Sequence, residues 1–225
     1  MSLDLENVSS QLDAVVSGIR IQSAGHKTRL EEAIKAIKSS DGSTINKKRI
    51  EGKFSWPTPI YSPQPERTYP PLEAPENYCV LATDGSHIDV DRHLPVGCYL
   101  INLGGCALTY GSEPDAQLFN NPHLAWEPEE LYLPDPQNPT REEPITGSVL
   151  GMIRTVRELE RLAESVEDCP PNRPILALVD GSLVMWGLSG QGYQPYVRDA
   201  IIHDRLMKAM DRLAELGPEK QVSLA

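Results

Sequence analysis

Apolar residues recur every three or four positions from residue 1 to about 40, which predicts helical structure there. Asp41-Gly42-Ser43 follows a polar helix end and is interpreted as a helix-terminating turn. Prolines then crowd the chain and exclude regular structure. The pattern predicts an N-terminal helical segment over 1–45 and a proline-rich linker over 46–77.

The linker contains two aromatic residues, Trp56 and Tyr61. Because aromatic side chains favour burial, we expect both to pack this segment against the body of the protein. A mobile arm is the alternative interpretation.

Strand-like sequence begins at Tyr78. YCVLATDGS predicts a short apolar strand that runs into a tight turn, and VGCYLINLGG and CALTYG predict two more strands joined by a turn at Gly104-Gly105. Segment 111–147 is polar and rich in proline, and it is too long for a plain connection. We interpret it as a functional loop, a lid or a partner surface.

The clearest helix is GSVLGMIRTVRELERLAESVED at 147–168, with Ser148 available as its cap. The apolar run ILALVDGSLVMWG follows it and predicts a buried strand that ends in another Asp-Gly-Ser. An amphipathic helix ending at Gly217 comes next, and the last residues are expected to be frayed. This alternation predicts an α/β domain over 78–225.

Composition narrows the function classes. No apolar run approaches the roughly 20 residues of a membrane span, and the N-terminus lacks the pattern of a signal peptide, so a cytoplasmic protein is expected. Four cysteines without CxxC spacing predict reduced structural thiols. Because the net charge is −11, the protein can bind a nucleic acid only through a local cluster of basic residues or with a partner protein that binds the phosphates.

Candidate chemistry centres on VLATDGS and LALVDGS, where Asp84 and Asp180 each follow an apolar strand. If these strands are neighbours, the two carboxylates meet at one sheet edge, which is unfavourable unless a cation neutralises them. Oxygen ligands favour Mg²⁺ or Mn²⁺ over zinc. The competing interpretation is that both aspartates are ordinary turn residues, as Asp41 is.

A metal site needs a third carboxylate, and the 147–168 helix offers glutamates that point in different directions. Either Glu158 or Glu160 faces the site, with Glu164 as a further candidate. Arg154 and Arg157 beside them contact phosphate or pair with these glutamates. His87 and His203 are more simply explained as surface residues than as ligands or proton carriers. Ser86 and Ser182 lack a G-x-S-x-G elbow, which argues against a serine hydrolase.

At these residues the sequence resembles the NurA nuclease family. The resemblance rests on TDGSH at 83–87, on GMIRTVRELERL in the helix, and on LVDGSLV at 178–184, and it covers 78–217. It implies a ribonuclease H-like mixed sheet flanked by helices, extended here by the N-terminal helices. Members of the family usually run longer and supply a further strand, with a late Tyr and a His or Asp at the site, so the resemblance implies that this sequence is either a C-terminally truncated fragment or a shortened member.

The resemblance also implies a function and its residues. The family's Mn²⁺-dependent nucleases act on DNA ends, with 5′ to 3′ exonuclease and single-strand endonuclease activity, as dimers that work with a HerA-type hexameric ATPase. Carried over, Asp84, Glu158 and Asp180 are the catalytic and metal-binding residues, with Glu160 as the fallback for Glu158. Arg154, Ser86 and Ser182 are assigned to substrate binding. The alternatives are a catalytically inactive adaptor for a translocase and a small-molecule metallophosphatase.

Overall fold

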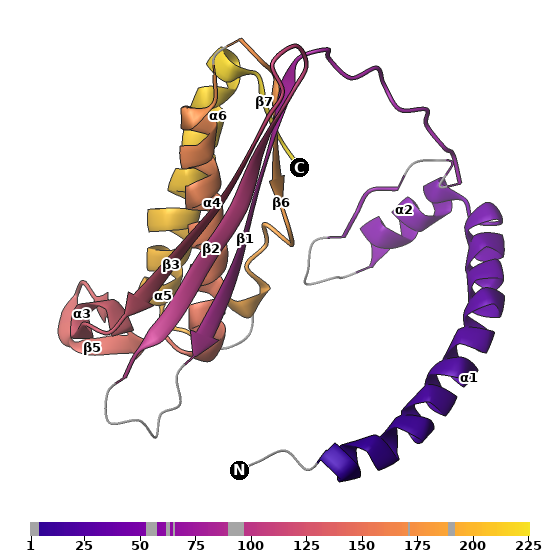
Figure 1. Ribbon diagram of the computed structural model, residues 1–225, viewed down its shortest axis with the longest axis horizontal. Coiled ribbons are helices and arrows are strands. Elements are labelled where there is room, and N and C mark those ends of the chain that lie inside the picture. The colour runs from indigo at the N-terminus through magenta and orange to yellow at the C-terminus, as the bar shows by residue number, and fades with distance from the viewer. Residues whose placement is uncertain are drawn as a thin grey trace. The chain divides into compact units, whose positions relative to one another are not determined.

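The computed structural model describes residues 5–52, 58–61, 64, 66–89, 97–170, 172–188 and 192–225. They form two compact units, Met1–Leu72 and Glu73–Ala225. The first unit holds helices α1 (Leu5–Lys38) and α2 (Gly42–Glu51) (Figure 1), so the predicted N-terminal helical extension is confirmed. Trp56 lies outside the described residues, and the packing of Tyr61 against the body of the protein stays a prediction.

The tripeptide at Asp41 does not end a helix as predicted but begins α2. The Asp41 carboxylate accepts hydrogen bonds from the backbone N–H groups of Ser43 and Thr44 at 3.1 and 3.0 Å. Asp is a favoured N-cap because its oxygens satisfy the unpaired donors of the first helical turn. Helix α2 therefore occupies the start of the segment predicted to be a linker without regular structure.

The second unit is built on a five-stranded sheet in the order β3-β2-β1-β6-β7. Strands β1 (Tyr78–Asp89), β2 (Tyr99–Tyr110) and β3 (Asp115–Ala125) are antiparallel neighbours. Strands β6 (Ile175–Val179) and β7 (Val222–Leu224) continue the sheet parallel to β1. Three antiparallel strands, a crossover helix and two parallel strands form the predicted ribonuclease H-like mixed sheet.

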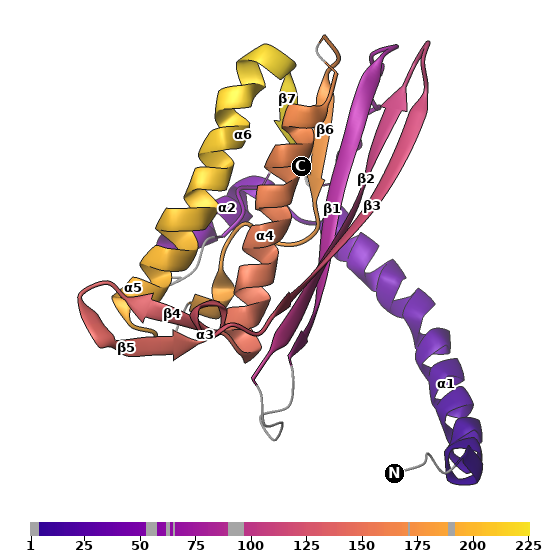
Figure 2. The ribbon, with the colours of Figure 1, turned by 60° about the vertical axis from the view of Figure 1, so that its left-hand side comes forward.

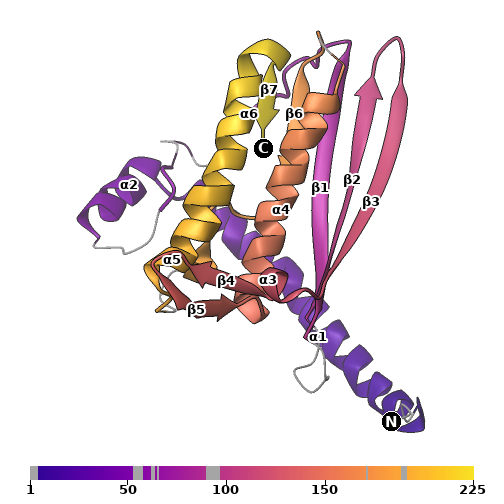
Figure 3. The ribbon, with the colours of Figure 1, turned by 90° about the vertical axis from the view of Figure 1, so that its left-hand side faces the viewer.

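The long helices of this unit pack on one face of the sheet (Figures 2 and 3). Helix α4 (Gly147–Asp168) contacts β1, β2 and β6, and α6 (Met207–Lys220) contacts α4 and β7. A stripe at helical spacing along α4 is fully buried, namely Leu150, Ile153, Val156, Leu159, Leu162 and Val166, each at most 2% exposed. This stripe and the inward residues of β1 and β2, such as Leu81 and Ile101, form the core.

Two predictions between β1 and α4 are wrong. Gly104-Gly105 is not a turn, because β2 runs through both residues in register with β1. Segment 111–147 is not one loop, since it contains β3, the short helix α3 (Pro128–Leu131) and a hairpin of β4 (Tyr132–Asp135) and β5 (Asn138–Pro144).

The C-terminal part also differs in detail from the prediction. A helical run made of α5 (Pro195–Arg198), a π-helical segment (Asp199–Leu206) and α6 ends at Lys220 instead of Gly217. The residues expected to be frayed form β7. The N-cap of α4 is Thr146 and not Ser148, and it makes no side-chain cap hydrogen bond.

Two compositional expectations can be compared with the structure. All four cysteines are free thiols. Among the described residues, no helix combines the length and the apolar character needed to cross a membrane.

Candidate functional site at the acidic sheet edge

Asp84 lies in the middle of a strand and not at a turn, so the prediction for the first tripeptide is wrong. Strand β1 continues through Asp84-Gly85-Ser86 to Asp89, and Asp84 is in register with Gly104 of β2. The second tripeptide does form a turn, because β6 ends at Val179 and Gly181 has a φ of +112°.

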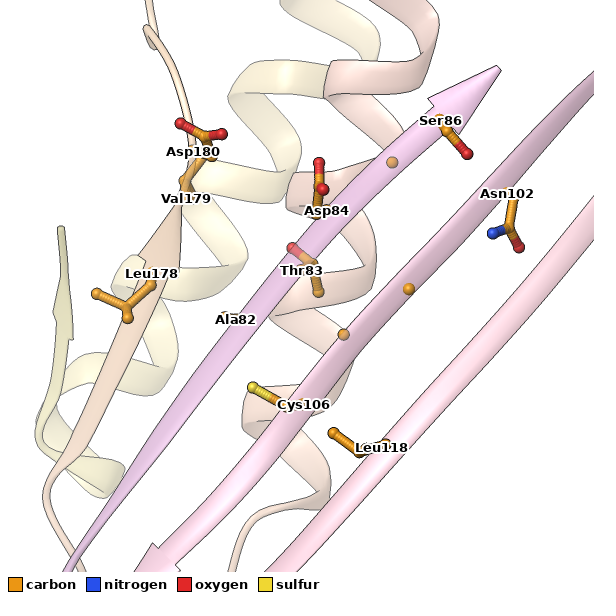
Figure 4. Close-up of a pocket in the computed structure, with 13 residues that line it drawn as sticks. Ala82, Thr83, Asp84, Ser86, Asn102, Cys106, Leu118, Leu178, Val179 and Asp180 are labelled. Carbon is orange, nitrogen blue, oxygen red and sulfur yellow. The ribbon is translucent and has the colours of Figure 1, made fainter. Parts of the chain in front are cut away.

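The register of two parallel strands nevertheless brings the two aspartates side by side. Thr83 of β1 pairs with Val179, the last residue of β6, so Asp84 and Asp180 directly follow this pair. Paired strands lie about 4.8 Å apart in a sheet. Both carboxylates border a cavity of about 750 Å³ on the sheet face that α4 does not cover (Figure 4). Within the described part of the chain, neither carboxylate forms a hydrogen bond or an ion pair.

Glu158 approaches the same point from the helix side. Its side chain is 4% exposed, and the hydroxyl of Thr83 donates to its backbone carbonyl at 3.0 Å. The carboxylate lies against Gly85, where a Cβ atom added to the glycine would stand 2.5 Å from Oε1 of Glu158. Gly85 therefore makes room for the glutamate, whereas the sequence suggested that it allows a sharp turn.

Burial, together with nearby negative charges, raises the pKa of Glu158 to about 7. Burial is the largest cause, and the negative charges of Asp84 and Asp180 act in the same direction. The guanidinium of Arg154 and a hydrogen bond from the backbone of Gly85 oppose them. Because both aspartates act on Glu158, the three carboxyl groups share one electrostatic environment.

Arg154 connects β1 to Glu158, but it leaves some buried polar atoms without hydrogen bonds. Its Nη1 donates to the carbonyl of Gly85 at 2.5 Å and lies 3.2 Å from Oε1 of Glu158. Oε1 of Glu158 and Nε of Arg154 are nevertheless buried without a hydrogen-bond partner among the described residues. Oε1 of Glu158 therefore has an ion-pair partner but no hydrogen bond, and a buried carboxylate oxygen without a hydrogen bond is costly.

The oxygen donors of this edge are of the kind that binds a divalent cation, but the distances between them are too long for them to share one. Three carboxylates offer only oxygen, which suits Mg²⁺ or Mn²⁺. As they stand, however, no three His, Cys, Asp or Glu side chains among the described residues are close enough together to hold a metal ion. Ligation by all three carboxylates therefore requires a rearrangement at this edge, because Asp84 lies on the sheet face that α4 does not cover and Glu158 lies on the α4 side, against Gly85.

The alternative glutamates are engaged elsewhere. Glu160 accepts two hydrogen bonds from Arg205, at 2.8 and 2.6 Å, and so ties α4 to the π-helical segment. Glu164 pairs with Arg161 on the helix surface at 3.0 Å. Of the three candidates, Glu158 is the one that lies against β1, beside Gly85.

The other candidates take separate positions. Ser86 borders the cavity of Asp84. Ser182 accepts a hydrogen bond from the backbone of Val184 at 3.0 Å, which is a turn contact. His87 is exposed, and His203 has a side chain that is 70% exposed and lies 3.9 Å from Asp199.

Sequence reasoning missed one polar residue of the cavity, Asn102 of β2. Its signal is an amide inside the apolar run YLINLGG, because asparagine is uncommon within strands.

The room at Gly85 allows a test of the geometry. Gly85→Ala is expected to displace the Glu158 carboxylate and to weaken Mn²⁺ binding roughly tenfold, since one ligand is lost from its position. Calorimetric titration of Mn²⁺ measures this effect. Gly151→Ala, on α4 with nothing closer than 4.0 Å to the added methyl group, is the matched control. Equal affinities for the two variants would contradict this role of Gly85.

The mixed sheet flanked by helices is a ribonuclease H-like α/β fold, and it carries this acidic edge. The particular family follows from comparison: the NurA domain model matches residues 79–213, more than half of the chain, and the chain belongs to the NurA family. The matched range includes Asp84, Glu158 and Asp180.

Two solved structures are also similar, a native and a CSH-mutant prototype foamy virus protease–reverse transcriptase. Each is 15% identical, with TM-scores of 0.37 and 0.36, over 69% of this chain and only 18% of the viral chain. No curated protein matches the chain.

Proposed function

We propose that the protein is a metal-dependent DNA nuclease that uses Mn²⁺ or Mg²⁺ held by Asp84, Glu158 and Asp180. The observation that carries the proposal is the register of β1 and β6, which sets Asp84 beside Asp180, the residue that follows β6. The second support is the buried Oε1 of Glu158, which has no hydrogen-bond partner among the described residues. Mutual repulsion of these groups is relieved when they share cations.

The bound ions would supply activation of water and stabilisation of the charge on the leaving oxygen. The protein itself positions the carboxylates that would hold these ions. Strands β1 and β6 fix the two aspartates, and Gly85 admits Glu158. Arg154, Ser86 and Ser182 are proposed to contact the substrate, with Arg154 able to pair with a phosphate when it leaves Gly85.

The cellular role proposed is DNA end resection and repair in the cytoplasm, by 5′ to 3′ exonuclease and single-strand endonuclease activity. The partner proposed is a HerA-type hexameric ATPase, and the active form a homodimer. The net charge of −11 supports a partner that delivers DNA, because a nuclease that held DNA alone would need a basic surface.

A catalytically inactive adaptor that binds a translocase is the second candidate. It is favoured by the present spacing of the carboxylates, in which no three described ligand side chains form a metal cluster, and by the ion pair of Arg154 with Glu158.

A cleavage assay separates the two proposals. Purified protein is incubated with single-stranded oligodeoxynucleotides labelled at the 5′ or the 3′ end, in Mn²⁺, in Mg²⁺ or in a chelator. The nuclease proposal expects cleavage that the chelator stops and that restored Mn²⁺ recovers, and the two labels give the polarity. Stable binding to the translocase without Mn²⁺ binding or cleavage would favour the adaptor.

A further inference from the structure

Asn102 is an unusual residue for its place in the sheet. It lies in β2, in register with Ser86 on one side and Pro122 on the other. Side chains alternate between faces along a strand, so Asn102 points to the same face as Asp84. It borders the cavity of Asp84 and Asp180 (Figure 4).

The Asn102 amide is not satisfied by the protein. Its Oδ1 is buried, and it has no hydrogen-bond partner among the described residues. A buried amide oxygen without a partner destabilises a fold, whereas an apolar side chain of similar size at this position would not. Asn102 thus weakens the sheet at the cavity wall, so a role in folding does not account for it.

Its distance from the acidic edge suits an extended ligand. Asn102 lies two residues along β2 from Gly104, the register partner of Asp84, which corresponds to about 7 Å along the strand. Gly104 has no side chain, so nothing from this residue fills the cavity between Asp84 and Asn102. A nucleic-acid strand with one phosphate at Asp84 would pass its neighbouring nucleotide over Gly104.

We propose that Asn102 binds the nucleotide next to the phosphate that is cut, through hydrogen bonds from its side-chain amide, and so sets the position of the substrate strand. This proposal rests on the proposed nuclease function. The unpartnered Oδ1 can accept a hydrogen bond from an N–H group of a base edge, and the amide NH2 can donate to a phosphate oxygen, so neither contact requires one sequence.

The test compares Asn102→Ala with Asn120→Ala. Asn120 is a matched control because it is also an asparagine on the same face, in the row of Asp84 and Gly104 on β3, but it does not border the cavity. Asn102→Asp, which keeps the shape and adds a negative charge near phosphate, is the second variant. The readouts are KM and kcat for Mn²⁺-dependent cleavage, the melting temperature, and anisotropy of a labelled oligodeoxynucleotide bound in an Asp84→Asn background.

Asn102→Ala is expected to raise KM roughly tenfold, the loss of one hydrogen bond to a charged group, with kcat within about twofold and an unchanged or higher melting temperature. Asn102→Asp is expected to raise KM further because the carboxylate repels phosphate. Asn120→Ala should leave all three quantities unchanged. Unchanged KM in both Asn102 variants, or a loss of activity that follows a lower melting temperature, would overturn the role of Asn102.

The same data separate this proposal from the nuclease proposal. Cleavage by the wild type with no effect at Asn102 overturns the present inference alone. Binding of the oligodeoxynucleotide that depends on Asn102, in a protein that does not cleave it, overturns the nuclease function and supports Asn102 as a ligand contact. A wild type that neither binds nor cleaves overturns both.

Discussion

Asp84→Asn and Asp180→Asn are each expected to lower Mn²⁺-dependent cleavage of single-stranded DNA at least about a thousandfold, because each removes a charged ligand from ions that supply several kcal/mol to the reaction. Asparagine keeps the size of the side chain. Since neither aspartate has a hydrogen bond or an ion pair within the described residues, the melting temperature should not fall. Loss of mutual repulsion should raise it slightly in the absence of metal. Initial rates and calorimetric Mn²⁺ titration measure the two effects.

Asp115→Asn is the matched control for these variants. Asp115 lies at the start of the exposed edge strand β3, away from the cavity of Asp84, so its neutralisation should leave the rate unchanged. Full activity in either Asp84→Asn or Asp180→Asn would contradict the proposed site, and equal losses in all three variants would point to a general effect of charge.

Glu158→Gln is expected to abolish cleavage while stabilising the metal-free protein at high pH. The native carboxyl has a pKa of about 7 against an ordinary value of 4.5, so the native state holds its proton where the unfolded state has lost it. Stability of the wild type therefore falls as pH rises from about 4.5 and levels off above about 7. Glutamine does not titrate, so the variant should be more stable by about 3 kcal/mol near pH 8.5 and equal near pH 4.

Denaturant unfolding in a chelator at both pH values measures this difference. Glu160→Gln is the control, because the reverse result is expected for it: lower stability with normal cleavage. Glu160 accepts two hydrogen bonds from Arg205, so its neutralisation should cost roughly 1 to 2 kcal/mol while leaving cleavage intact. If Glu158→Gln showed the same pH dependence as the wild type, the buried carboxyl would not be the group that titrates. Added Mn²⁺ should stabilise the wild type but not Glu158→Gln.

Elements with a strong local signal can be predicted from the sequence, and elements defined by their neighbours cannot. The apolar stripe of α4 gives a helical period on its own, and the predicted and observed bounds of this helix agree. Strand β3 has one buried residue, Ala125, and contains Pro122, which an edge strand tolerates because its outer side needs no partner. Its polar sequence therefore resembles a loop, and β7 likewise becomes a strand only through its pairing with β6.

The candidate site is predictable to a similar degree. Two apolar strands that lead into Asp84 and Asp180 indicate the shared edge, and the helix between them offers Glu158. The mid-strand position of Asp84 escapes prediction because Asp-Gly-Ser favours turns, whereas here the pairing of Asp84 with Gly104 extends β1. The contact between Gly85 and Glu158 joins residues far apart in sequence, and no local pattern predicts it.

The register between β1 and β6 also makes the aspartate pair a reporter of complete folding. Asp84 belongs to the first strand, which can pair with β2 and β3 through short connections, whereas Asp180 arrives only after α4 has crossed over and β6 has inserted beside β1. Contacts between residues so distant along the chain form slowly. A folding intermediate that contained only the β1-β2-β3 sheet would have Asp84 in place but not Asp180. Recovery of Mn²⁺ affinity during refolding should therefore lag behind recovery of the circular dichroism signal of β-structure.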